Sequence, residues 1–123
     1  MKKLSLLIIL CMVLLFGAVG CQTQVFVGNS TSSAKQFLLD YTILNSTKTH
    51  DIKLEKGSTV NVIIENKSGN LDIIISDTNG EKIYKGDNAA SGKFSLQIPK
   101  TDTYKFSVTG RNAKGSVSFK IAD

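Results

Sequence analysis

Thr103-Tyr104-Lys105-Phe106-Ser107-Val108-Thr109 is the stretch that decides the fold, because apolar and polar residues alternate without a break along it. Side chains two residues apart lie on the same side of a β-strand, so the three apolar residues form one buried face. The same period of two recurs at 39–43, 52–54, 60–64, 71–75, 94–98 and 117–121. A helical period is not sustained anywhere after residue 36, so we expect strands and no helix.

Turn-forming residues separate these runs. They are Lys56-Gly57, Ser68-Gly69-Asn70, Asp77-Thr78-Asn79-Gly80, Pro99 and the segment 110–115. Short strands at this spacing are typical of sandwiches and barrels. The sequence therefore predicts an all-β fold: an antiparallel β-sandwich or jelly-roll-like domain of about seven to eight short strands, over residues 36–123, after an N-terminal signal peptide.

Ile63 and Ile74 place an apolar side chain on the second face of their strands. Burial on both faces is typical of central strands, so we expect two central strands paired across Ser68-Gly69-Asn70. The alternative is a single exposed isoleucine on each strand, which is common on protein surfaces.

The first 20 residues have the layout of a secretory signal. Lys2-Lys3 precede a nearly unbroken apolar run, and Ala18-Val19-Gly20 offer small side chains before Cys21. This order resembles a bacterial lipobox, in which a signal peptide (1–20) is removed and the cysteine thiolate receives a diacylglycerol. Ala18 stands where lipoboxes usually carry Leu. The resemblance implies a lipid on Cys21, a palmitate-type acyl anchor and a place on the outer face of the cytoplasmic membrane.

Two other outcomes remain open for this segment. Ala18-Val19-Gly20 also fits ordinary signal cleavage, which would release a secreted protein that starts at Cys21. Without cleavage, the helix from Leu4 to Cys21 would be about 27 Å long, just short of a full membrane span. Gly17, Ala18 and Gly20 favour a cleavage region.

Residues 21–35 are expected to form the lipidated cysteine and a flexible tether, because they are small and polar. Val25-Phe26-Val27 is the exception: it is an interfacial contact, an unordered segment or a first strand that docks on the domain. Removal of Lys2 and Lys3 lowers the formal net charge from +5 to +3. That charge is dispersed, so we expect no nucleic-acid partner. The scarcity of Arg beside many Lys, Asn and Ile resembles proteins of Gram-positive bacteria.

Four segments resemble the bacterial pre-peptidase C-terminal (PPC) domain. They are the opening Leu54-Glu55-Lys56-Gly57-Ser58-Thr59-Val60, the strand and turn from Gly69 to Gly80, the strand from Thr101 to Val108, and the closing strand from Gly115 to Ile121. Asp102 stands where that family commonly has Gly. The resemblance covers about residues 50–122 and implies a compact jelly-roll-like sandwich with a role in binding or secretion.

The chemistry-bearing residues do not form a catalytic motif. His50 is the single histidine, and no nucleophile accompanies it in a recognisable pattern, so we expect no enzyme. Tyr41 and Tyr84 are either part of a stacking platform or core packing. We expect no cofactor. The candidates for calcium, which some members of the resembled family bind, are hard oxygen ligands around one hairpin end: Asp72, Asp77, Asn79 and Asp87.

These observations predict a membrane-anchored surface lipoprotein that acts as a non-catalytic binding or accessory module of the cell envelope. Its partners would be the cytoplasmic membrane, through diacylglyceryl-Cys21, and an envelope polymer or protein. A structural or regulatory partner of a membrane protein complex is the alternative, and a small hydrolase that uses His50 is a third. The fold alone does not decide between these three functions, because one fold hosts many functions; the residues of the site have to decide.

Overall fold

A computed structural model describes residues 23–122 of the chain. This part is all-β and contains no helix, so the expected fold class is confirmed. The strands are β1 (Val25–Ser33), β2 (Gln36–Asn45), β3 (Thr47–Leu54), β4 (Thr59–Ser76), β5 (Lys82–Gly86), β6 (Gly92–Gln97) and β7 (Asp102–Ile121). Among these residues, no helix is long and apolar enough to cross a bilayer.

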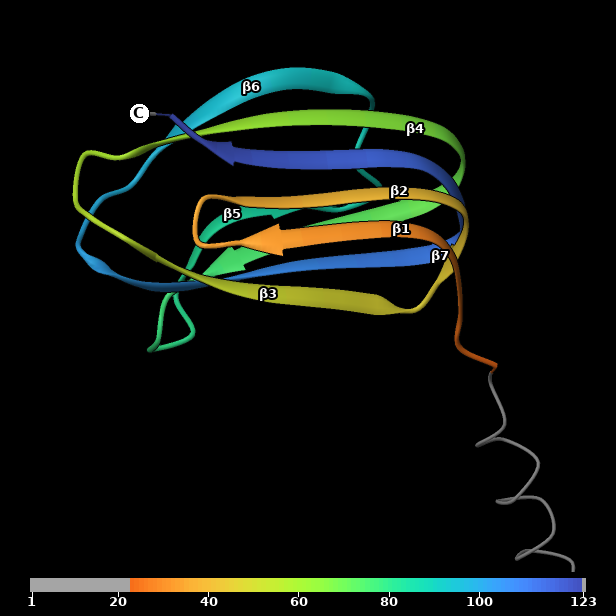
Figure 1. Cartoon of the computed structure of the whole chain (residues 1–123), viewed down its shortest axis with the longest axis horizontal. Coiled ribbons are helices and arrows are strands. Elements are labelled where there is room, and N and C mark those ends of the chain that lie inside the picture. The colour runs from red at the N-terminus through yellow and green to blue at the C-terminus, as the bar shows by residue number, and fades with distance from the viewer. Residues whose placement is uncertain (1–22, 123) are drawn as a thin grey trace, which may run out of the picture.

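Two long strands, β4 and β7, pass through both layers of the sandwich (Figure 1). In one layer, the first half of β4 and the second half of β7 lie between β6 on one side and β2 and β1 on the other. In the other layer, the remaining halves lie between β5 and β3. Every pairing is antiparallel. The sandwich is therefore one sheet folded over at the bends of β4 and β7.

The two bends replace two loops that the sequence predicts. Ser68-Gly69-Asn70 does not make a hairpin, and 110–115 does not end a strand; both segments lie inside β4 and β7. The register slips between Asn66 and Asn70, and Gly69 and Gly115 have φ values of 75° and 147°. A Cβ on Gly115 would collide with the backbone carbonyl of Glu65. Glycine thus lets each strand turn sharply and continue.

β4 is flanked on both sides in each layer, which confirms the central position predicted from Ile63 and Ile74. Both side chains are half-buried. The predicted pairing of two strands across Ser68-Gly69-Asn70 is wrong, because both isoleucines belong to one strand. Both halves of β4 pair instead with β7, which follows the same edge of β4 from Val60 to Ser76.

The core consists of the apolar faces that the alternation predicts. Tyr104, Phe106 and Val108 are fully buried, and Phe106 meets Phe119 edge-on with ring centroids 5.1 Å apart. Ile43 is a correction: it is 44% exposed, whereas Leu44 is buried. The register of β2 against β7 breaks between Tyr41 and Leu44, so the inward position moves by one residue.

Val25–Ser33 is β1 and pairs along its length with β2, so the first-strand alternative for Val25-Phe26-Val27 is confirmed, and the expected tether is wrong for residues 28–33. The polar composition suggested a tether because the side chains from Val27 to Ser33 are exposed. An edge strand is held by backbone hydrogen bonds, so it does not require apolar side chains. The predicted signal peptide and Cys21 lie outside the described residues.

Side chains close the open edges of the sandwich. On one side, His50 contacts the carbonyl oxygen of Ser33 at 2.7 Å, and the Lys48 ammonium lies 4.5 Å from the centre of the Phe26 ring. On the other side, the rings of Tyr84 and Phe94 pack 5.1 Å apart. These contacts join β3 to β1 and β5 to β6.

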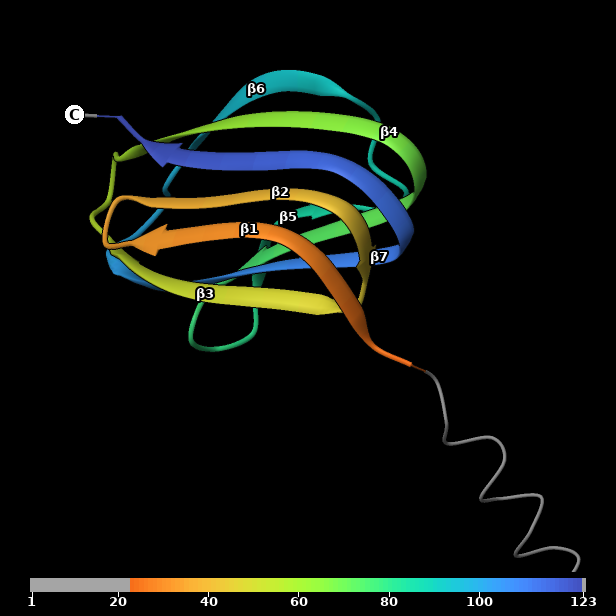
Figure 2. The same ribbon diagram turned by 45° about the vertical axis from the view of Figure 1, so that its right-hand side comes forward.

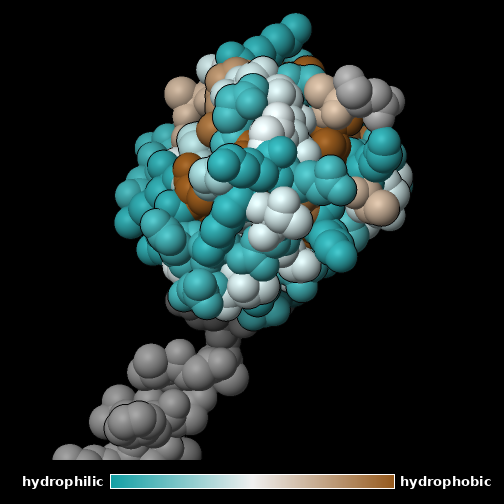
Figure 3. Space-filling model, turned by 90° about the vertical axis from the view of Figure 1, so that its left-hand side faces the viewer, coloured by the Kyte–Doolittle hydropathy of each residue, from teal (hydrophilic) through white to brown (hydrophobic). Residues whose placement is uncertain are grey.

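The sandwich has two dissimilar ends (Figures 1 and 2). We call one the bend end: it holds the bends of β4 and β7, the β2–β3 corner and the start of β1. We call the other the loop end: it holds the turns β1–β2, β3–β4, β4–β5 and β6–β7. The surface viewed from the loop end is largely hydrophilic, with only small, separate apolar spots (Figure 3).

Candidate functional site

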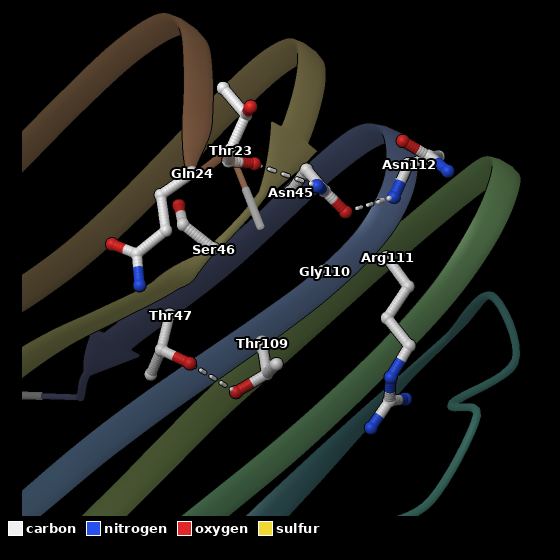
Figure 4. Close-up of a pocket in the computed structure, with 9 residues that line it drawn as sticks. All are labelled: Thr23, Gln24, Asn45, Ser46, Thr47, Thr109, Gly110, Arg111 and Asn112. Carbon is white, nitrogen blue, oxygen red and sulfur yellow. Dashed lines mark hydrogen bonds between the residues drawn. The ribbon is translucent and has the colours of Figure 1, made fainter. Parts of the chain in front are cut away.

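A groove with a volume of about 570 Å³ lies at the bend end. The start of β1, the corner between β2 and β3, and the bend of β7 meet there (Figure 4). Its lining is almost entirely polar: Thr23, Gln24, Asn45, Ser46, Thr47, Thr109, Gly110, Arg111 and Asn112. The sharp bend of β7 brings its residues next to a corner that lies more than 60 residues earlier.

Asn45 holds the groove together. Its Nδ2 donates to the carbonyl oxygen of Thr23 at 3.1 Å, and its Oδ1 accepts from the backbone N–H of Asn112 at 3.1 Å (Figure 4). The hydroxyls of Thr47 and Thr109 are 2.8 Å apart. These bonds join three elements, so the groove is formed before any ligand arrives.

Arg111 supplies the positive charge at the groove. Its Nη1 lies 2.7 Å from Asp72 Oδ2, and the guanidinium side chain remains 60% exposed. The backbone N–H of Asn88 and the guanidinium of Arg111 both lower the pKa of Asp72, the backbone bond being the stronger cause. Arg111 is thus fixed in place while most of its donors face solvent, where they are able to bind an anionic or carbonyl oxygen.

The groove is suited to binding a polar ligand. Its lining offers hydroxyls, amides and one guanidinium, and no carboxylate or histidine lines it as a base. Ser46 Oγ is buried there and has no hydrogen-bond partner among the described residues. A polar ligand with several hydrogen-bonding groups matches this lining.

The four calcium candidates do not share one hairpin end, which corrects the prediction. Asp72 and Asp87 lie near the bend end, whereas Asp77 and Asn79 form the β4–β5 turn at the loop end. Asp77 follows Asp72 by five positions along the extended chain, which corresponds to about 16 Å. Asp87 lies 3.7 Å from Lys85. Within residues 23–122, no three His, Cys, Asp or Glu side chains gather in a way that could hold a metal ion.

Asp77 and Asp102 form a structural network at the loop end. Asp77 Oδ1 accepts from the backbone N–H groups of Asn79 and Glu81, both at 2.9 Å, as expected for a turn that begins with Asp. Lys100 Nζ lies 2.9 Å from Asp77 Oδ2 and, by hydrogen bonding, lowers the pKa of Asp77.

Asp102 fastens the same turn to the start of β7. It accepts from the Thr78 hydroxyl at 2.9 Å and from the backbone N–H of Thr103 at 2.8 Å. The Thr103 bond is the main reason that the pKa of Asp102 is lowered. Asp102, the position at which the chain departs from the PPC pattern, therefore joins two loops that a glycine could not join.

His50 and the two tyrosines are engaged in packing. The His50 ring lies 5.5 Å from the Phe37 ring, and its Nε2 contacts the backbone carbonyl oxygen of Ser33, so both contacts hold the ring in place between β1 and β2. Tyr41 is buried and Tyr84 packs on Phe94, so neither forms an exposed platform. Burial raises the pKa of Tyr41 to about 12, with a smaller contribution from Asp40.

Sequence reasoning missed the groove residues Asn45, Arg111 and Asn112. One signal was available: Arg111 is the exception among basic residues that are otherwise lysines, and it lies in a polar segment. The convergence of that segment with Asn45 depends on the β7 bend, which no local pattern predicts.

No protein-family model and no curated protein matches the chain. Among solved structures, the chain is similar to PliG of Aeromonas hydrophila, a periplasmic inhibitor of g-type lysozyme. The TM-score is 0.50 at 18% identity, over 77% of this chain and 88% of that one. Accessory secretory protein 1, 2 and 3 of Streptococcus pneumoniae gives a TM-score of 0.42 at 14% identity, over 84% and 99%. The likeness to PliG concerns the β-sandwich fold alone, and no family is assigned.

Proposed function

We propose that the mature protein is a non-catalytic binding module of the cell envelope, anchored on the extracytoplasmic face of the membrane by a diacylglycerol on Cys21. One observation carries the proposal: the lipobox-like segment that ends at Cys21 is followed, four residues later, by the first strand of a complete sandwich. A second acyl chain makes membrane binding stable, whereas a single chain binds marginally.

The groove at the bend end is the binding site that the geometry favours. Its preformed hydrogen bonds and its guanidinium suit a polar or anionic group of an envelope polymer or protein. Since a likeness at 18% identity carries only the fold, the inhibitory role of PliG enters here as one activity to test. The PPC resemblance likewise remains a proposal for the origin of the domain.

A second candidate is a partner of a membrane protein complex, and the length of the linker favours it. Only Gln22, Thr23 and Gln24 separate Cys21 from β1. At about 3.5 Å per residue, the sandwich would begin within about 14 Å of the anchored cysteine. A domain held so close meets the extracytoplasmic parts of membrane proteins more readily than it meets distant wall polymers.

Mass spectrometry of the mature protein tests the anchor. We expect an N-terminal Cys21 with a diacylglycerol thioether, and release of Cys21→Ser into the medium. An unmodified thiol on a protein found only in the culture fluid would refute the anchor and leave the secreted alternative.

Cross-linking in membranes and retention on purified wall glycan test the partner. Capture by cross-linking of one membrane protein that is lost in Arg111→Ala supports the second candidate, whereas retention on glycan that is lost in the same variant supports the first. Lysozyme inhibition is measured beside them. Turnover of any substrate that disappears in His50→Ala would contradict the non-catalytic proposal.

A further inference from the structure

Two exposed apolar side chains lie together on the outer face of β1 and β2. Val27 is 52% exposed and Ile43 is 44% exposed, and among residues 23–122 these are the large apolar side chains that are exposed. They are partners in the β1–β2 register, so they form one apolar pair. Phe26, the residue before Val27 in β1, packs instead against the core, and the Lys48 ammonium lies over its ring.

The apolar pair lies at the end of β1 that is nearest to Cys21. Val27 follows Cys21 by six residues, so their Cα atoms are at most about 20 Å apart. Beyond Val27, the exposed residues of β1 are glycine, asparagine, serine and threonine, from Gly28 to Ser33. The apolar surface of this edge strand is therefore confined to the part that the preceding chain keeps close to residue 21.

We propose that Val27 and Ile43 sit in the headgroup region of the bilayer, so that the outer face of β1 and β2 at the bend end lies against the membrane. This inference rests on the proposed lipid on Cys21. Aliphatic side chains gain free energy when they leave water for the headgroup boundary. The headgroup region is about 5–7 Å deep on each side of a bilayer, and the short linker holds the pair within reach of it.

The rest of the molecule agrees with this orientation. Arg111 and the hydroxyls of the groove lie at the same bend end, and an exposed guanidinium is compatible with nearby anionic headgroups. The surface viewed from the loop end is largely hydrophilic (Figure 3). In the proposed orientation, this end points away from the membrane. The lipid determines that the protein is on the membrane, and the apolar pair determines which side of the sandwich faces it.

Fluorescence quenching on vesicles tests the orientation. The lipidated mature protein carries a fluorophore at Thr42→Cys, beside the apolar pair, or at Asn79→Cys in the loop-end turn. It is incorporated in vesicles of phosphatidylcholine and phosphatidylglycerol and isolated by flotation. We expect iodide to quench the label at position 42 several-fold less than the label at position 79, and bromolipid to quench it more.

A matched variant isolates the role of the pair. Val27→Thr with Ile43→Thr keeps both side chains β-branched and removes their apolar character. We expect the variant to float with the vesicles, because the lipid still holds it, and the label at position 42 to become accessible to iodide.

Each other outcome overturns the inference. A floating protein whose two labels are equally accessible refutes the orientation and leaves the anchor standing. A protein that does not float refutes both. If the label at position 42 is also protected from iodide in lipid-free Cys21→Ser protein, and this protection increases with protein concentration, the apolar pair contacts a second copy of the chain instead of the bilayer.

Discussion

Tyr104 donates a hydrogen bond of 2.6 Å from its hydroxyl to the backbone carbonyl of Lys100, four residues earlier in the chain. The Tyr104 ring is fully buried between the layers, and the bond ties the start of β7 to the loop before it. Tyr41 is also buried, but its hydroxyl has no partner among the described residues. Two tyrosines in one core therefore differ in a single hydrogen bond.

The same substitution should have opposite effects at these two positions. Tyr104→Phe should lower the free energy of unfolding by about 0.5–1.5 kcal/mol, because it removes a satisfied hydrogen bond. Tyr41→Phe should raise it by about 1–3 kcal/mol, because it removes a buried hydroxyl that is unpaired. Urea unfolding measures both. A loss of stability in Tyr41→Phe would mean that the hydroxyl has a partner after all.

Tyr41 should also make the protein sensitive to alkali. Its pKa is about 12 in the fold against 10.0 for a free tyrosine. The unfolded chain thus releases this proton first, so the free energy of unfolding, which Tyr41 leaves independent of pH below about pH 10, falls as the pH rises toward 12. Between these values, Tyr41→Phe should lose less stability than the wild type. Parallel loss in both proteins would contradict the assignment.

At acid pH, the contact between Asp77 and Lys100 should matter. The pKa of Asp77 is lowered from 3.8, with Lys100 as the first cause, so its contribution is complete above that pH and is lost as the pH falls through the lower, folded value. Asp77→Asn retains an oxygen for the turn and loses the charge. We expect the variant to be less stable at neutral pH and the difference to narrow below about pH 3.8. Asp87→Asn, at an exposed pair, is the control and should change little.

The bend of β7 should depend on Gly115. Its φ is 147°, and an added Cβ would meet the carbonyl of Glu65, so Gly115→Ala should prevent folding or lower Tm severely. Gly57 also has a positive φ, of 89°, but nothing lies within 4 Å of the corresponding Cβ. Gly57→Ala should therefore cost only backbone strain, about 1–3 kcal/mol. Equal melting temperatures for the two variants would refute the role of the bend.

The register break in β2 predicts unequal effects for neighbouring residues. Leu44 is fully buried, so Leu44→Ala should cost about 2–5 kcal/mol. Ile43 is 44% exposed, so Ile43→Ala should change stability by no more than about 0.5 kcal/mol. Thermal melts of both variants test the register. A larger loss of stability in Ile43→Ala than in Leu44→Ala would support the unbroken alternation that the sequence suggests.

Calcium should leave the melting temperature of the protein unchanged. Asp72 is bonded to Arg111 and Asp77 to Lys100, at opposite ends of the hairpin. Thermal melts in the presence of calcium and in the presence of a chelator test this expectation. A rise in Tm that Asp72→Asn abolishes would reinstate the calcium site.

The sequence predicted the core better than the connections. The alternation around Tyr104, Phe106 and Val108 identified buried residues, because each strand contributes its own period of two. Ser68-Gly69-Asn70 looked like a turn between two strands, since glycine serves bends and turns equally well. The groove was not predicted, because Asn45 and Asn112 come together only when β7 bends.

By itself, the sequence determined the all-β class, the inward faces of most strands and the turn at Asp77, because period and turn chemistry are local properties. Only the tertiary structure decided that polar residues 28–33 are an edge strand and that Val27 meets Ile43. It also decided that two bent strands join both layers. Those features depend on pairing between distant segments, which is held by backbone hydrogen bonds common to all residues and leaves little trace in side-chain pattern.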